Sequence, residues 1–183
     1  MPAMFRLRKC AQYAAPFLAL ALLACFGGVK KTGKVVDYKP GRVITKQGYY
    51  DVGPLSADWY RIKLGIAAIN FRNDALGSTI STDAFCDQAF DDAPLNALTG
   101  HLFAGLQDIK IEKQTPFMMA DRGALRTSLK ATLDGVPVRI ETVVLKKDWC
   151  LFDFYLVSPP EKFAAALPDF EAFFQGFQFT GEI

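Results

Sequence analysis

Between residues 109 and 157 the chain has runs in which apolar and polar side chains alternate, and one run that is almost continuously apolar, and both patterns predict strands. These patterns predict a strand at 109–113, followed by an antiparallel meander of strands at 115–120, 124–133, 136–145 and 149–157. Asp134-Gly135 predicts a tight hairpin, because both central residues of a type I′ turn need positive φ. The strand at 149–157 is almost continuously apolar, so we expect it to lie near the centre of the sheet.

Shorter apolar runs precede this meander. They predict strands at 59–64, 67–72 and 78–82, of which the second is the more continuously apolar. Thr82 or Asp83 is then positioned to cap a helix. That predicted helix carries Phe85, Cys86, Ala89 and Phe90.

Apolar residues at helical spacing predict two further helical regions. A helix within residues 91–106 is capped by Asp92 and has one apolar face, made by Leu95, Leu98, Leu102, Phe103 and Leu106. The tail predicts two short helical segments that divide before Pro168. Its phenylalanines at helical spacing favour packing on a sheet over the alternative, the lining of a lipid-binding cavity.

The first residues have the order of a secretory signal: basic residues, an apolar run and then small residues. Arg6, Arg8 and Lys9 precede an apolar run of 11 residues at 14–24. A helix that crosses a bilayer needs about 20 residues, so a transmembrane span is a poor fit, although an uncleaved anchor stays an alternative.

The residues "LLAC", Leu22 to Cys25, resemble the lipobox of bacterial lipoproteins, with Leu23 an unusual choice for the middle position. The resemblance implies that residues 1–24 are a signal peptide and that Cys25 carries a diacylglyceryl thioether and an acylated (palmitate-type) amino terminus. Such a protein is anchored to a membrane by lipid and does not span it. Because Phe26 and not aspartate follows the cysteine, the resemblance favours the periplasmic face of the outer membrane over the inner membrane.

Processing changes the charge of the chain. The full sequence has 21 basic and 19 acidic residues, a net charge of +2; without residues 1–24 it has 18 and 19, a net charge of −1. A nucleic-acid-binding domain needs a basic patch and a high pI, so nucleic acid is excluded as the expected partner. Residues 25–53 are rich in glycine and predict a lipidated N-terminus and flexible tether with a possible edge strand, and residues 54–183 suit a single domain.

Two of the four cysteines remain after Cys10 is removed with the signal and Cys25 is lipidated. Cys86 and Cys150 form an even pair in an exported domain, which favours a disulfide over two buried free thiols. There is no C-x-x-C motif, and His101 is the only histidine, so neither a thioredoxin-like site nor a metal site is expected.

The order of strands, helix, meander and terminal helix predicts an α+β domain, a curved antiparallel sheet with packed helices. The segment from Gly123 to Phe179, which ends "FYLVSPPEKFAAALPDFEAFFQGFQF", resembles the closing part of PsbP-like and DcrB-like domains. Through "FDFYLVSPPEKF" it is also similar to small uncharacterised envelope lipoproteins. The resemblance covers about a third of the chain, implies the fold, and brings no catalytic motif.

Candidate chemistry in the chain is sparse. His101 is expected to be a partly buried structural residue, and it lacks the G-x-S-x-G motif of a hydrolase. Asp91 with Asp92 and Asp83 with Asp87 are carboxylate pairs, and Arg122 with Arg126 is a candidate for an anionic group. No phosphate-binding glycine loop occurs. We therefore predict no catalytic residues and no cofactor, and leave the ligand-binding residues unassigned.

These observations favour a membrane-anchored, non-enzymatic accessory or binding domain of the cell envelope, acting with an envelope protein of unknown identity. One alternative is a carrier of a lipid or other apolar ligand. Another is a hydrolase-type enzyme that uses His101 and a carboxylate.

Overall fold

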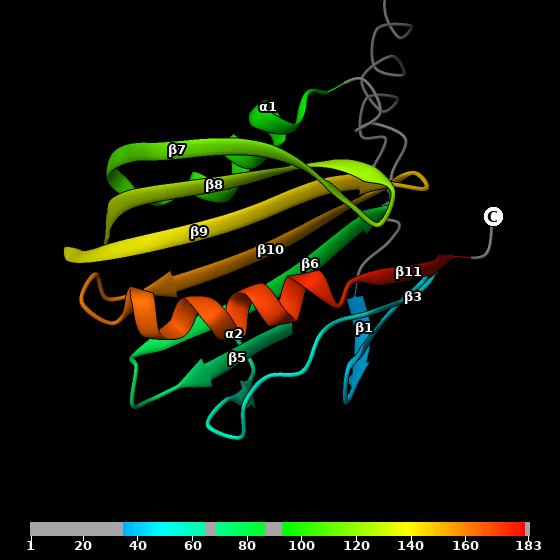
Figure 1. The fold of residues 1–183 in the computed structure, drawn as a ribbon, viewed down its shortest axis with the longest axis horizontal. Helices are drawn as coiled ribbons and strands as arrows, with labels where there is room; N and C mark the ends of the chain where they lie inside the picture. The colour runs from blue at the N-terminus through cyan, green and yellow to red at the C-terminus, as the bar shows by residue number, and fades with distance from the viewer. Residues whose placement is uncertain (1–34, 65–68, 87–92, 182–183) are drawn as a thin grey trace, which may run out of the picture. The chain divides into compact units, whose positions relative to one another are not determined.

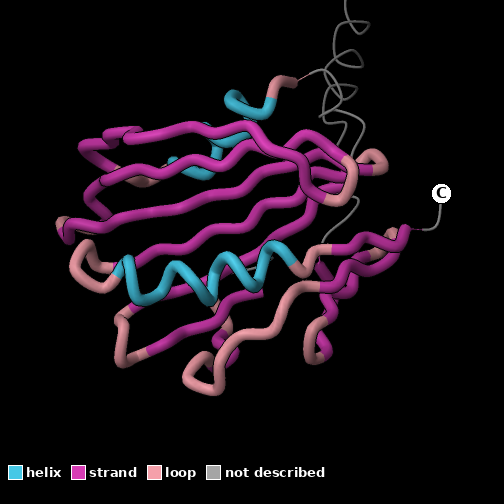
Figure 2. The backbone as a smooth tube through the Cα atoms, in the orientation of Figure 1, coloured by secondary structure: helices cyan, strands magenta, loops and turns pink. Residues whose placement is uncertain are grey.

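The computed structural model describes residues 35–64, 69–86 and 93–181, and strands account for 58% of them (Figure 2). These residues form two antiparallel sheets (Figure 1). The larger has the order β4-β5-β6-β10-β9-β8-β7, with β4 Tyr60–Ile62, β5 Ile69–Asn73, β6 Ser78–Cys86, β7 Gln107–Met119, β8 Arg122–Leu133, β9 Val136–Lys147 and β10 Cys150–Ser158. The smaller has the order β1-β2-β3-β11, with β1 Val35–Lys39, β2 Arg42–Thr45, β3 Gly48–Asp51 and β11 Gln178–Gly181. The helices are α1 Leu95–Gly100, the 3₁₀ helix η2 His101–Phe103 and α2 Phe163–Gln175.

The predicted meander is present in the large sheet. The strands expected at 109–113 and 115–120 are one bulged strand, β7, which pairs with β8. Asp134 and Gly135 have φ of 50° and 81°, which confirms the predicted tight hairpin between β8 and β9. β10 lies between β6 and β9 in the middle of the sheet, as its apolar sequence predicts.

The strand β6 continues where a helix was predicted. That prediction is wrong for Asp83 to Cys86, because β6 pairs with β10 residue by residue as far as Cys86 opposite Cys150. Pairing with β10 outweighs the local helical spacing in this stretch, while β5 pairs with β6 only as far as Thr82. Ala89 and Phe90 lie outside the described residues.

Helix α2 crosses one face of the large sheet (Figure 1). Its phenylalanines are at most 3% exposed: Phe163, Phe170, Phe173 and Phe174. The ring of Phe173 meets that of Phe71 edge to face, with centroids 5.6 Å apart, and Phe174 meets Phe117 in the same manner at 6.2 Å. The aromatic stripe therefore packs on the sheet, the arrangement that we expected over a lipid-binding lining.

The tail forms one helix and not two. Pro168 lies inside α2, where it removes one backbone hydrogen bond. Phe163 and Phe170, on either side of the proline, are buried in the same core cluster. Burial of both rings offsets the cost of the proline and holds the two halves in one helix.

The opposite face of the large sheet is covered in part by α1 and η2. Leu98 of α1 packs with Val144 and Leu151, while Phe103 and Leu106 pack against a second cluster that includes Leu129 and Ile140. The helix expected within 91–106 is therefore divided into α1 and η2, and its predicted cap, Asp92, lies outside the described residues.

Residues 35–53 differ from the expected tether, because β1, β2 and β3 are paired strands. β11 joins them from the end of the chain, with Phe179 opposite Tyr50. Tyr50 is fully buried against Phe152, with centroids 5.2 Å apart, and its hydroxyl lies 3.0 Å from Thr82 Oγ1. The folded domain thus includes residues before the expected boundary at residue 54. No helix in the described part of the chain is long and apolar enough to cross a membrane.

Candidate functional site

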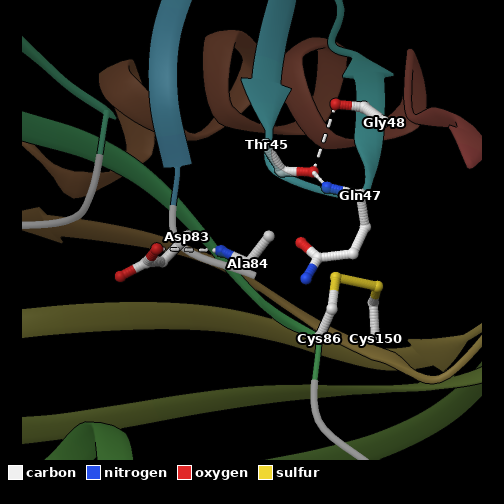
Figure 3. The surroundings of a disulfide bond; sticks show 7 residues. All are labelled: Thr45, Gln47, Gly48, Asp83, Ala84, Cys86 and Cys150. Carbon is white, nitrogen blue, oxygen red and sulfur yellow. Dashed lines mark hydrogen bonds between the residues drawn. A yellow bond between two sulfur atoms is a disulfide. The ribbon is translucent and has the colours of Figure 1, made fainter. Parts of the chain in front are cut away.

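Cys86 and Cys150 form a disulfide, as the cysteine count predicts. The two residues are direct partners at the end of the β6–β10 ladder, 64 residues apart in sequence. Figure 3 shows Thr45 and Gln47, at the β2–β3 turn, beside this bond. The disulfide therefore lies where the end of the large sheet meets the small sheet.

Several candidate residues lie outside the described part of the chain: Cys25, Asp87, Asp91 and Asp92. His101 is exposed at the start of η2, which differs from the partly buried position expected for it. Within the described residues it forms no ion pair with a carboxylate.

The two arginines considered for anion binding each contact carboxylates. Arg126 pairs with Glu141, and its Nη2 lies 2.8 Å from Glu171 Oε1 on α2. Arg122 Nη2 lies 3.7 Å from Asp148 Oδ1. Arg126 therefore joins α2 to the sheet, and its charge is compensated by two acidic partners.

A buried carboxylate pair lies at the centre of the large sheet. Asp83 of β6 and Asp153 of β10 are directly opposite each other and are 8% and 3% exposed. Phe152 and Phe154 point towards α2, so the intervening Asp153 points to the other face. Burial, and then repulsion by Asp83, raises the pKa of Asp153 to about 8. At neutral pH the Asp153 carboxyl is therefore protonated.

Polar groups surround this pair on the same face. The Ser81 hydroxyl donates to Asn70 Oδ1 at 2.6 Å, and burial raises the pKa of Tyr155 to about 12. Thr142 is opposite Tyr155 on β9. The hydroxyl oxygen of Thr142 and Asp153 Oδ1 are both buried, and neither has a hydrogen-bond partner among the residues that the structure describes. This cluster can hold a proton at neutral pH.

A basic concavity of about 660 Å³ opens on the outer face of the small sheet. Three cationic residues line it: Lys39 of β1, Arg42 of β2 and Lys46 in the β2–β3 turn. They share this face because Val43 and Tyr50, at the alternate positions, are buried in the core. Tyr49 and Thr180 complete the wall from β3 and β11.

The three cationic residues of the concavity differ in whether they have an acidic partner. Arg42 donates to both oxygens of Asp51 at 2.6 and 3.0 Å, and its guanidinium lies 3.8 Å from the centre of the Tyr49 ring. The hydrogen bond to Asp51 raises the pKa of Arg42. Lys39 and Lys46 have no ion pair among the described residues, so their charges are available to an anion.

Sequence reasoning missed this concavity. The alternation in "KPGRVITKQGYYD", Lys39 to Asp51, contains the signal, because Arg42, Ile44 and Tyr49 fall on one face once the β2–β3 hairpin is recognised. The pairing of β3 with β11 joins segments from the two ends of the domain, and no local pattern reports it.

No family model and no curated protein matches this chain. Its fold is similar to that of cyanobacterial PsbP (CyanoP) from Synechocystis sp. PCC 6803, with 12% identity, a TM-score of 0.53, and coverage of 87% of this chain and 99% of that one. LpqN of Mycobacterium tuberculosis, described as involved in cell envelope biogenesis, has 12% identity, a TM-score of 0.53, and coverage of 73% and 85%.

A protein of unknown function from Pseudomonas aeruginosa has 10% identity, a TM-score of 0.50, and coverage of 82% of this chain and 99% of that one. At such identities the likeness concerns the fold alone. The fold is similar to that of a PsbP-like protein, as the resemblance of Gly123 to Phe179 implies. Antiparallel sheets with packed helices are present, but the described residues are mostly sheet, so the predicted α+β class is confirmed only in part.

Proposed function

We propose that this protein is a lipid-anchored, non-enzymatic accessory domain of the bacterial cell envelope, and that it binds an anionic group on the outer face of its small sheet. The lipobox-like "LLAC" supports the anchor, and the disulfide suits an oxidising compartment. The likeness of fold to LpqN is consistent with an envelope role. An envelope protein that acts with it stays a prediction.

The basic concavity carries the binding proposal. Lys39 and Lys46 approach it from a strand and a turn, and neither has an acidic partner in the described residues. Between them, Arg42 is fixed by Asp51 and stacked on Tyr49. A phosphate or carboxylate placed here receives charge-assisted hydrogen bonds from the lysines, while the tyrosine ring provides an apolar wall for the group that bears it.

The binding proposal is tested with glycerol 3-phosphate and inorganic phosphate as probes. The amide resonances of residues 39–49 are followed by NMR in the full chain, and we expect saturable shifts confined to the concavity. Lys39→Ala with Lys46→Ala should abolish them, whereas the matched control Lys162→Ala, at an exposed position before α2, should leave them unchanged. Absence of any saturable shift, or equal shifts in the double variant, contradicts the proposal.

The anchor is tested separately by fractionation of cells. Wild type should sediment with membranes, and after separation of the two membranes it should appear with the outer one. Cys25→Ala should release the protein or leave its signal uncleaved, which intact mass distinguishes. If the Cys25→Ala protein keeps the wild-type mass and membrane location, the anchoring proposal is wrong.

A further inference from the structure

Trp149 occupies an unusual position at the tip of the β9–β10 hairpin. Its side chain is 57% exposed, and its backbone has φ of 63° next to Asp148 at 51°. Both central positions of this turn therefore require the left-handed region, which glycine and asparagine adopt readily and a bulky residue does not. Trp149 is thus a large, exposed aromatic residue at a position where the backbone conformation favours a smaller one. Such a conformation is typical of positions with a functional role.

The neighbouring hairpin adds further apolar surface and charge at the same end of the sheet. The contact of 3.7 Å between Arg122 and Asp148 joins the β7–β8 turn to the β9–β10 turn, and Figure 1 shows both turns at the same end of the large sheet. Met118, next to the β7–β8 turn, is 70% exposed. Trp149 and Met118 are thus accompanied by the cations Arg122 and Lys147.

The chain from Cys25 enters the domain at this end as well. Val35, the first residue of β1, is opposite Thr45, and Figure 3 shows Thr45 and Gln47 beside the disulfide of Cys150, the residue after Trp149. Cys25 and Val35 are ten positions apart in the sequence, a distance that a fully extended chain spans with at most about 36 Å. A lipid on Cys25 would therefore lie within about 36 Å of Val35, which is at the Trp149 end of the sheet.

We propose that the Trp149 hairpin tip, with Met118 and Arg122, inserts into the headgroup layer of the membrane that holds the Cys25 lipid and so fixes the orientation of the domain. Tryptophan is suited to this layer because its ring has an apolar body and a polar N–H. Arginine and lysine beside it complement anionic headgroups. The inference rests on the proposed lipid anchor, and it leaves the basic concavity as a separate site.

The chain offers a direct spectroscopic test, because it has only two tryptophans and Trp59 is buried at 7% exposure. The lipidated full-length protein is reconstituted into phosphatidylethanolamine–phosphatidylglycerol vesicles, with and without brominated acyl chains. In Trp59→Phe, we expect the Trp149 emission to shift to the blue on reconstitution and to be quenched by the brominated lipid. In Trp149→Phe, the Trp59 emission should be unaffected by bromination.

A matched control places tryptophan at the opposite end of the same sheet. Val136, beside the Asp134-Gly135 hairpin, is 60% exposed. In the background without Trp59 and Trp149, Val136→Trp should emit in the red and escape quenching. Circular dichroism verifies that each variant is folded.

These experiments distinguish failure of the proposed orientation of the domain from failure of the proposed lipid anchor. If the protein co-floats with vesicles while Trp149 remains unquenched, or is quenched no more than Val136→Trp, the orientation is wrong although the anchor stands. If a photo-crosslinker at position 149 labels a protein and not lipid in cells, the tip is a protein contact and the inference is overturned. If Cys25→Ala alone prevents flotation, the anchor is supported whichever result Trp149 gives.

Discussion

Asp153 faces Asp83 directly across the β6–β10 ladder, at the centre of the large sheet and nearly out of contact with solvent. Desolvation raises the pKa of Asp153 to about 8, and the neighbouring Asp83 adds to the effect. The pair consequently retains a proton at neutral pH. The folded protein therefore binds a proton that the unfolded chain has already lost.

The pKa of Asp153 is higher in the folded protein than in the unfolded chain. We therefore expect the free energy of unfolding to fall as pH rises from about 4 to about 8, by up to ~1.4 kcal/mol per pH unit from this group. Asp153→Asn resembles the protonated acid and cannot ionise. Its free energy of unfolding should be close to that of wild type at pH 4 and higher at pH 8. Urea unfolding at several pH values measures this, with Asp58→Asn, at an exposed loop position, as the control. If Asp153→Asn loses stability with rising pH as steeply as wild type, the raised pKa of Asp153 is not the cause of the pH dependence.

The Cys86–Cys150 bond closes a loop of 64 residues between the two strands that pair most centrally. In the chain-entropy model such a loop stabilises the fold by about 4 kcal/mol. We expect reduction, or Cys86→Ala with Cys150→Ala, to lower the free energy of unfolding by about 2–4 kcal/mol. Urea unfolding with and without reductant measures the loss. Reductant should leave the double variant unchanged, and an equal effect on both proteins would show that another process is responsible.

Local sequence signals predicted the features that residues adjacent in the chain decide. The Asp134-Gly135 turn follows from two neighbouring residues, and the central position of β10 was predicted from its own almost continuously apolar sequence. The continuation of β6 to Cys86 could not be predicted in this way, because the decisive interaction is pairing with a strand more than 60 residues later. Helical spacing in "DAFCDQAF" is a weaker influence than that pairing.

The candidate sites could not be predicted either, because they too depend on pairing between strands that are far apart in the sequence. Asp153 is enclosed in the apolar run "WCLFDFYLV", and only strand pairing brings it opposite Asp83. The basic concavity depends on Thr180 and Tyr49 meeting across β11 and β3. The cysteine count predicted the Cys86–Cys150 disulfide because it needs no geometry, only the number of thiols that the predicted processing would leave.

A close backbone contact joins the small sheet to α2. The amide of Gly53 donates to the carbonyl of Phe173 at 2.8 Å, and a Cβ on Gly53 would lie 1.9 Å from the Ala172 carbonyl oxygen. A Cβ on Gly176 would lie 2.3 Å from the Gly53 nitrogen. Only glycine fits at either position.

Gly53→Ala and Gly176→Ala should each lower the free energy of unfolding by about 2–4 kcal/mol, because backbone must move to accept the methyl group. Gly123→Ala is the control, since a Cβ there has no heavy atom within 4 Å, and its effect should stay within about 0.5 kcal/mol. Thermal and urea unfolding measure the stability of all three variants. If all three variants behave alike, the close approach of α2 to the loop after β3 is wrong.

Arg126 and Glu141 form an ion pair in which the glutamate is buried. The Glu141 side chain is 2% exposed and also accepts from the Ser128 hydroxyl at 2.6 Å, so it depends on Arg126 for compensation of a buried charge. Arg126→Met should destabilise the protein by about 3–5 kcal/mol, because it leaves that charge uncompensated. Replacing Glu141 by Met in the same chain removes the uncompensated group, and the double variant should recover most of the loss. Arg122→Met is the matched control: its side chain is 56% exposed and its partner Asp148 is partly exposed, so the cost should be below about 1 kcal/mol. A double variant less stable than Arg126→Met would indicate that Arg126 and Glu141 contribute separately and do not act as a pair.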